Sequence, residues 1–290
     1  MWVYLILSDP VQKGEPFYGS EKPPEKNFSK AVYYYAECGN NAGSNDSKTK
    51  EREVVMSKVT YEIIEKDERL YFHDGEKYVL FDSGFGAQFG RNSASVSGKI
   101  GPFPANVMPA AFFSHFINVR MDDGEAVGGV LNCMDGYNCL LQGNTLTVTD
   151  EASECPEHEY FFEFAHPVLP LLEGEINGRR GRFFFDSGAR MTMILDRSVA
   201  AAESIRSYRE WMGALGFYEE LPVFRTELSF PNGFRCGGEG ALVTNPFYTA
   251  AAARADICAM LGIDIFKRYD LFFAVKAPRR GIALLKKEER

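Results

Sequence analysis

The sequence has few histidines, no closely paired cysteines, no long hydrophobic run and no excess of basic residues. Its four histidines and six cysteines are scattered, and no two cysteines have the two-residue spacing of a zinc site. We therefore expect separate thiols and no metal or other cofactor. The 32 basic residues are outnumbered by 40 acidic ones, and the formal charge of -8 argues against a nucleic-acid partner.

No segment approaches the roughly 18 consecutive apolar residues that a membrane helix needs, so no membrane span is predicted. The opening segment, MWVYLIL, is apolar but has no basic residue before it and no small-residue cleavage site after it. It is more typical of a first strand than of a signal peptide, and the cytoplasm is the favoured location.

Aromatic residues, by contrast, are abundant, with 24 Phe and 14 Tyr among 290 residues, as in strand-rich proteins. Alternating apolar residues predict strands over 53–64 and over 69–81, with a turn at Asp74-Gly75. A second hairpin is predicted over 171–185, turning at Asn177-Gly178. The chain is long enough for one large domain or for two lobes.

Two segments are poor in apolar residues. Residues 8–52 are rich in Pro, Gly, Asn, Ser and Lys and predict a loop-rich edge around one candidate strand at 31–37. Residues 151–160 are polar and acidic and are typical of a linker. They divide the chain into an N-terminal part, residues 1–150, and a C-terminal part, residues 161–290.

One helix is predicted in the C-terminal part, over residues 197–216. Asp196 is a suitable N-cap, and Gly216 would end the helix. Apolar residues recur between them at intervals that place them on one helical face: Val199, Ile205, Tyr208, Met212 and Leu215.

The most informative feature is an internal similarity. Residues 74–86 and 177–190 each contain a turn dipeptide, a short strand ending in Phe and then Asp-Ser-Gly. Downstream, residues 128–148 and 259–284 each contain an aliphatic pair, a few polar residues, a Tyr and a final strand. One Asp-Ser-Gly is an ordinary turn, but two in matching contexts predict a repeat with one Asp in each copy.

A repeat of this kind brings two carboxyl groups, those of Asp82 and Asp186, to a common midline. Two carboxyls that face each other cannot both ionise readily, so they share one proton. One can then activate water while the other protonates a carbonyl oxygen, which is general acid/base hydrolysis of an amide. The residues that follow each Asp would support the pair by hydrogen bonds and a tight backbone turn: Ser83, Gly84, Ser187 and Gly188.

The segments INGRRGRFFFDSGARMTMI and AMLGIDIFKRYDLFFAV resemble the Asp-Thr/Ser-Gly-Ala and hydrophobic-hydrophobic-Gly motifs of retropepsin-like aspartic peptidases. Ala189 completes the first motif, and Leu261-Gly262 forms the second. The resemblance covers most of residues 168–286, and residues 53–149 resemble a more divergent copy. Two copies in one chain resemble the bilobal arrangement of pepsin.

The resemblance implies a mostly β fold of two small acid-protease-like barrels, related by a quasi-twofold repeat, with one helix of note in the second lobe. It also implies an aspartic endopeptidase that uses Asp82 and Asp186 on a peptide or protein substrate bound between the lobes. With both aspartates in one chain, the protein is expected to be a monomer.

The first copy departs from the family pattern. Phe85 follows Asp-Ser-Gly where a small residue is usual, and Asn132 replaces the Gly of the second motif. No flap hairpin with its usual aromatic residue is evident, although residues 93–104 and 230–240 are candidates. In the second copy, Asp264 is expected to be a surface or turn residue.

Three alternatives remain open at this point. The first is a homodimeric peptidase that pairs two C-terminal lobes and uses Asp186 alone. The second is a non-enzymatic peptide-binding protein on a degenerate peptidase fold, which Phe85 and Asn132 favour. The third is an unrelated β sandwich in which the Asp-Ser-Gly turns occur by chance.

Overall fold

The computed structural model describes residues 58–85, 89–92, 99–109, 113, 116–212 and 215–287, and these residues belong to one compact unit. The loop-rich region predicted over 8–52, with its candidate strand, lies outside the described residues. Strands dominate the part that is described, as predicted. No helix within these ranges is long and apolar enough to cross a membrane.

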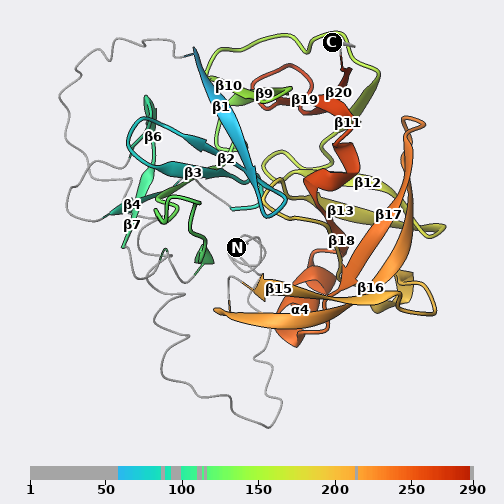
Figure 1. The fold of residues 1–290 in the computed structure, drawn as a ribbon. Coiled ribbons are helices and arrows are strands. Elements are labelled where there is room, and N and C mark those ends of the chain that lie inside the picture. The colour runs from blue at the N-terminus through green and yellow to red at the C-terminus, as the bar shows by residue number, and fades with distance from the viewer. Residues whose placement is uncertain are drawn as a thin grey trace, which may run out of the picture. The chain divides into compact units, whose positions relative to one another are not determined.

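Six antiparallel strands form a platform to which each half of the chain contributes three (Figure 1). The two halves meet where β9 pairs with β19, in a register that sets Leu140 opposite Phe272. In sheet order the platform strands are β11 (Tyr160–Glu163), β20 (Gly281–Lys286), β19 (Tyr269–Ala274), β9 (Asn138–Gln142), β10 (Thr145–Thr149) and β1 (Lys58–Lys66).

The N-terminal lobe continues this sheet beyond β1. The hairpin predicted with a turn at Asp74-Gly75 is present as β2 and β3. The further strands, in sheet order, are β2 (Arg69–His73), β3 (Tyr78–Phe81), β8 (Gly129–Leu131), β4 (Phe89–Asn92) and β7 (Asn106–Pro109). A separate two-stranded ribbon comprises β5 (Lys99–Ile100) and β6 (Phe103–Pro104).

The C-terminal lobe is a closed barrel of six strands, because the first and last strands of its series, β12 and β16, also pair. Its first hairpin turns at Asn177-Gly178, as predicted. Both residues have positive φ, 51° and 76°, as a two-residue hairpin turn requires. In order around the barrel the strands are β12 (Leu171–Ile176), β13 (Arg179–Phe185), β18 (Ile257–Leu261), β14 (Thr192–Ile194), β17 (Arg235–Leu242) and β16 (Phe217–Ser229).

The two lobes share strand order and strand direction. The series β2-β3-β8-β4-β7 and β12-β13-β18-β14-β17 follow the same path. In both, the second strand is parallel to the third, the third antiparallel to the fourth, and the fourth parallel to the fifth. The sequence similarity between the two halves is therefore matched by topology, in a two-lobed acid-protease-like fold.

The helix predicted over 197–216 is wrong. Asp196 does cap a helix, since its carboxylate accepts from the Ser198 N–H, but this is a single 3-10 turn, η1 (Arg197–Val199). The chain then forms strand β15 (Arg206–Met212), which pairs with β16. Tyr208 and Met212 are four residues apart, and residues at this spacing lie on one face both of a helix and of a strand. The apolar pattern therefore fits either type of element.

The helix of note in the second lobe is instead α4 (Pro246–Arg254). The Asn245 side chain accepts from the Phe247 N–H, and a proline occupies the first turn, where its missing N–H costs nothing. A 3-10 turn, η2 (Ile263–Phe266), follows β18. Aromatic side chains connect the halves, with Phe273 packed on Phe81 from one lobe and on Phe185 from the other.

Candidate active site

Each Asp-Ser-Gly turn follows a strand that is buried beside a parallel neighbour. Asp82 comes directly after β3, and its N–H donates to the Leu131 carbonyl of β8 at 3.0 Å. Asp186 comes directly after β13, and its N–H donates to the Leu261 carbonyl of β18 at 2.9 Å. The aliphatic residue of the second motif in each copy therefore fixes the backbone of the aspartate.

The two serines join the turns by four hydrogen bonds that form two equivalent pairs. The Ser83 N–H donates to Ser187 Oγ at 2.9 Å, and the Ser187 N–H donates to Ser83 Oγ at 3.0 Å. Each hydroxyl in turn donates across the lobes at 3.3 Å, Ser83 to the Phe185 carbonyl and Ser187 to the Phe81 carbonyl. Both serines are buried, so these bonds are shielded from water.

The two glycines allow the carboxyl groups to approach closely. The Gly84 N–H donates to Asp82 Oδ1 and the Gly188 N–H to Asp186 Oδ1, each at 2.8 Å. A Cβ on Gly84 would overlap the Asp186 carboxyl, and one on Gly188 would overlap the Asp82 carboxyl. Each glycine therefore lies against the aspartate of the opposite lobe, and a side chain at either position would separate the pair.

The electrostatics of the pair follow from its burial and from the proximity of the two carboxyls. The pKa of Asp82 is raised well above its usual value, first by burial, then by the charge of Asp186 and by a hydrogen bond between the two carboxyls. Asp186 is 9% exposed. The arrangement favours one proton shared by the pair, with a single negative charge.

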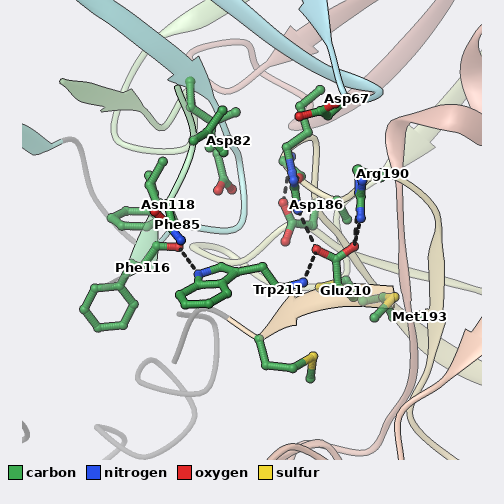
Figure 2. Close-up of a pocket in the computed structure, with 18 of the residues that line it drawn as sticks. Asp67, Asp82, Phe85, Phe116, Asn118, Asp186, Arg190, Met193, Glu210 and Trp211 are labelled. Atoms are coloured by element: carbon green, nitrogen blue, oxygen red, sulfur yellow. Dashed lines mark hydrogen bonds and ion pairs between the residues drawn. The ribbon is translucent and has the colours of Figure 1, made fainter. Parts of the chain in front are cut away.

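A cavity of about 280 Å³ opens over the two carboxyl groups (Figure 2). Its wall in the N-terminal lobe includes Tyr71, Leu80, Phe85, Phe116 and Ile117. Its wall in the C-terminal lobe includes Ala189, Met193, Leu195, Met212, Val243, Tyr248 and Met260. The lining is mixed, because charged side chains share it with these apolar ones: Asp67, Arg69, Arg120, Arg190 and Glu210, besides the two aspartates. Polar groups that converge on a cavity with apolar walls are typical of a ligand site.

The hairpin β15–β16 reaches the cavity, although the apolar pattern predicts a helix over the residues that form its first strand. The Trp211 side chain lines the cavity, and its indole N–H donates to the Phe116 carbonyl of the N-terminal lobe at 3.2 Å. Figure 2 shows Trp211 and Glu210 below the two aspartates, on neighbouring positions of one strand. The sequence does contain one indication of this hairpin. Tyr208, Glu210 and Met212 are two residues apart, as on one face of a strand, and a charged residue between two large side chains on such a face can mark a functional site.

The two segments proposed as flaps do not line the cavity in the parts that the structure describes. Residues 230–240 form the turn of the β16–β17 hairpin and most of its second strand, β17. Of residues 93–104, only 99–104 are described, and they form the ribbon of β5 and β6. The hairpin β15–β16 is instead the one that borders the aspartates.

The departures in the first copy have local explanations. Phe85 is buried, contributes to the cavity wall and packs edge-on against Phe116. The Asn132 side chain accepts from the Met134 N–H at 2.9 Å, so it caps the turn after β8. Gly262, its counterpart, has no room for a side chain, because a Cβ there would lie 2.9 Å from the Ala189 carbonyl oxygen.

Asp264, which we expected at a surface or turn, lies in the 3-10 turn η2 but is not fully solvated. One of its carboxylate oxygens is buried without a hydrogen-bond partner, and burial raises its pKa to about 6. No group of three or more His, Cys, Asp or Glu is arranged to hold a metal ion among the described residues.

No protein-family model and no curated protein sequence matches the chain. Among solved structures, the chain is similar to the aspartic proteinase from Irpex lacteus. The two share 9% sequence identity and superpose with a TM-score of 0.41, over 79% of this chain and 98% of that chain. A likeness at this level carries no weight for chemistry, which depends on the side chains described above. The chain has two lobes whose Asp-Ser-Gly turns meet at one cavity lined by apolar and charged side chains.

Proposed function

We propose that this protein is an aspartic endopeptidase, in which Asp82 and Asp186 activate a water molecule for attack on a peptide bond. The observation that supports this most directly is the reciprocal contact of the two Asp-Ser-Gly turns. Each glycine abuts the opposite carboxyl, and each serine binds the opposite turn.

Hydrolysis of the peptide bond requires a water molecule and one proton shared by the two carboxyls. With one carboxylate ionised, that group accepts a proton from the attacking water, while the protonated partner donates to the carbonyl oxygen of the substrate. The tetrahedral intermediate then collapses as its C–N bond breaks. The carboxyl that took the proton from water donates it to the leaving nitrogen, and the other carboxylate takes back the proton from the intermediate's hydroxyl, which restores the singly protonated pair. The Gly84 and Gly188 N–H groups hold the carboxyls in place through both steps.

An extended peptide is the substrate class that suits the surroundings. The cavity walls are rich in Met, Leu, Val and aromatic side chains, which accept apolar side chains of a peptide. The hairpin β15–β16 borders the same cavity and offers strand backbone for pairing with an extended chain. Both aspartates come from one chain, so a monomer suffices, and the domain limits 1–150, 151–160 and 161–290 remain our working division.

The test is cleavage of an unfolded protein substrate over about pH 3 to 7 by the full chain and by Asp82→Asn and Asp186→Asn. Asp256→Asn serves as a matched control, because that side chain is 85% exposed and far in sequence from both turns. Loss of cleavage in both active-site variants, with retained fold and a retained control, is the expected result.

Other outcomes select the alternatives. Loss in Asp186→Asn alone, with activity that disappears on dilution, would favour a homodimer that uses one aspartate from each copy. Absence of cleavage at every pH, with binding of peptides retained, would favour the non-catalytic peptide-binding protein. Cleavage by both active-site variants would exclude the mechanism.

A further inference from the structure

A buried ionic cluster beside the aspartates has no part in the proton transfers described above. It consists of Glu210 on β15, Arg69 at the start of β2, and Arg190, four residues after Asp186. Figure 2 shows the Glu210 carboxylate with hydrogen bonds on both sides, next to the cavity that contains the dyad. Glu210 is 7% exposed, and the side chains of Arg69 and Arg190 are 17% and 20% exposed.

The single carboxylate joins three parts of the protein. Glu210 Oε1 accepts from Arg69 Nη2 of the N-terminal lobe at 2.8 Å. Glu210 Oε2 accepts from Nε and Nη2 of Arg190, both at 3.2 Å, and also from the Tyr208 hydroxyl. The carboxylate thus connects β15 to the first lobe and to the segment that follows the second Asp-Ser-Gly.

Arg69 extends the connection to the catalytic turn itself. Its Nε donates to the Gly188 carbonyl at 2.8 Å. Gly188 is the residue whose Cα faces the Asp82 carboxyl and whose N–H holds Asp186. One guanidinium therefore contacts the hairpin through Glu210 and the dyad through Gly188.

The cluster also fixes the tryptophan on the hairpin. Glu210 Oε1 accepts from the Trp211 backbone N–H at 2.9 Å, and the Trp211 indole spans to the Phe116 carbonyl. Burial alone would raise the pKa of Glu210, but Arg69, the Tyr208 hydroxyl and Arg190 hold it below its usual value. The group therefore remains ionised, as a bridge between two cations requires.

Building such a cluster is costly, because three charges lose much of their hydration and an ion pair only partly repays that loss. An apolar contact between β15 and the lobes would be a simpler way to stabilise the fold. The cluster is better explained by geometry, because a carboxylate with two guanidinium partners admits few arrangements of the three segments.

From this arrangement, and resting on the proposed function, we infer that Glu210 is a positioning residue. Through Arg69 and Arg190 it fixes the hairpin β15–β16 and the Gly188 turn relative to the two aspartates. Glu210 also lines the cavity, but in this role it acts through its hydrogen bonds to Arg69 and Arg190 and not through the reacting atoms. It determines where the hairpin and its Trp211 lie when a peptide occupies the cavity.

The test compares Glu210→Gln with Glu239→Gln in a Trp2→Phe background, which leaves Trp211 as the sole tryptophan. Glu239 is a matched control, because it pairs with Arg206 on the same strand β15 but is 43% exposed. Acrylamide quenching of Trp211 fluorescence reports the position of the hairpin without any reference to catalysis. We expect Glu210→Gln to raise the quenching constant at least about twofold, since the bridge is lost, and Glu239→Gln to leave it unchanged.

Kinetics provide the second measurement. Misplacement of the hairpin and the Gly188 turn should lower kcat about tenfold or more in Glu210→Gln while KM changes less than about threefold. A role confined to stability would lower the melting temperature and leave both kinetic constants unchanged at temperatures where the variant is folded. If the parent protein does not cleave peptides, the proposed function fails, and the quenching measurement still decides the position of the hairpin.

If Glu210→Gln does not fold, the double variant Arg69→Gln/Glu210→Gln takes its place, because it restores the net charge of the cluster. A raised quenching constant in the double variant supports the inference, because it shows that the net charge alone does not hold the hairpin in place when the Glu210 hydrogen bonds are missing. Quenching and kcat equal to those of the parent, in whichever variant folds, would overturn the inference.

Discussion

Replacement of either serine in the Asp-Ser-Gly turns by alanine should destabilise the protein strongly and to the same extent. Ser187→Ala removes the acceptor of the Ser83 N–H and the donor to the Phe81 carbonyl. Ser83→Ala removes the two equivalent bonds on the other side. Each of the two lost bonds has a net value of about 1 kcal/mol, and a buried N–H left without a partner adds about 1–3 kcal/mol, so we expect about 3–5 kcal/mol for each variant.

Guanidinium denaturation monitored by circular dichroism measures this loss. Ser198→Ala is the matched control, because Ser198 also donates to a neighbour, the Asp196 carboxylate, but is exposed. It should change the free energy of unfolding by less than about 0.5 kcal/mol. A threonine at position 83 or 187 retains the hydroxyl and should recover most of the stability that alanine loses.

The equality of the two losses is the critical part of this prediction. A cost of several kcal/mol at one serine with almost none at the other would mean that the turns do not hold each other reciprocally. The symmetric description of the site would then be incorrect, even if one of the two turns were essential.

Three further predictions address buried groups at and near the site. For Asp264→Asn, the variant lacks a carboxyl whose pKa in the folded parent is raised by burial to about 6. In the parent, the stability that this group contributes is complete below the pKa of the unfolded state and is lost as pH rises through 6. The parent should therefore lose about 2 kcal/mol more unfolding free energy than the variant between about pH 4.5 and pH 7.5, as measured by denaturation. Equal losses in both proteins would contradict this, and Asp256→Asn should match the parent. For Tyr71→Phe, removal of a buried hydroxyl that has no hydrogen-bond partner should raise stability by about 1 kcal/mol in thermal unfolding, and a loss of stability would show that the hydroxyl has a role. For Gly84→Ala, the new Cβ overlaps the Asp186 carboxyl, so kcat/KM should fall at least about a hundredfold, and near-parental activity would mean that the carboxyls need not approach closely.

The sequence was sufficient for the features that depend on local patterns. Asn177-Gly178 predicted its hairpin turn because both residues readily adopt positive φ. The mostly β class followed from alternation and from aromatic content. The two Asp-Ser-Gly turns were found because a repeat marks corresponding positions without any knowledge of distances, and the structure places them together. Their catalytic role is still a proposal.

The features that the sequence did not predict depend on long-range contacts. Glu210 lies 141 positions from Arg69, and nothing in either local segment indicates that they meet. The segment 206–212 was misassigned because Tyr208 and Met212 fit both periods, and only its pairing with β16 distinguishes strand from helix. In the same way, residues 93–104 and 230–240 are plausible flap hairpins from the sequence alone, whereas the helix predicted over 197–216 conceals the hairpin that borders the cavity.

The platform at the junction of the lobes has a consequence for the time course of folding. Strand β9 pairs with β19 in a register that sets Leu141 opposite Leu271. The chain between these two strands must therefore fold before their hydrogen bonds can form. Pairings between such distant segments form slowly, because the loop entropy is lost before the contacts are gained. Asp82 and Asp186 do not face each other until β9 and β19 have paired. If the chain is a peptidase, a nascent or partly folded molecule therefore has no aspartate pair with which to cut itself or another protein, and its activity appears only as its two halves join.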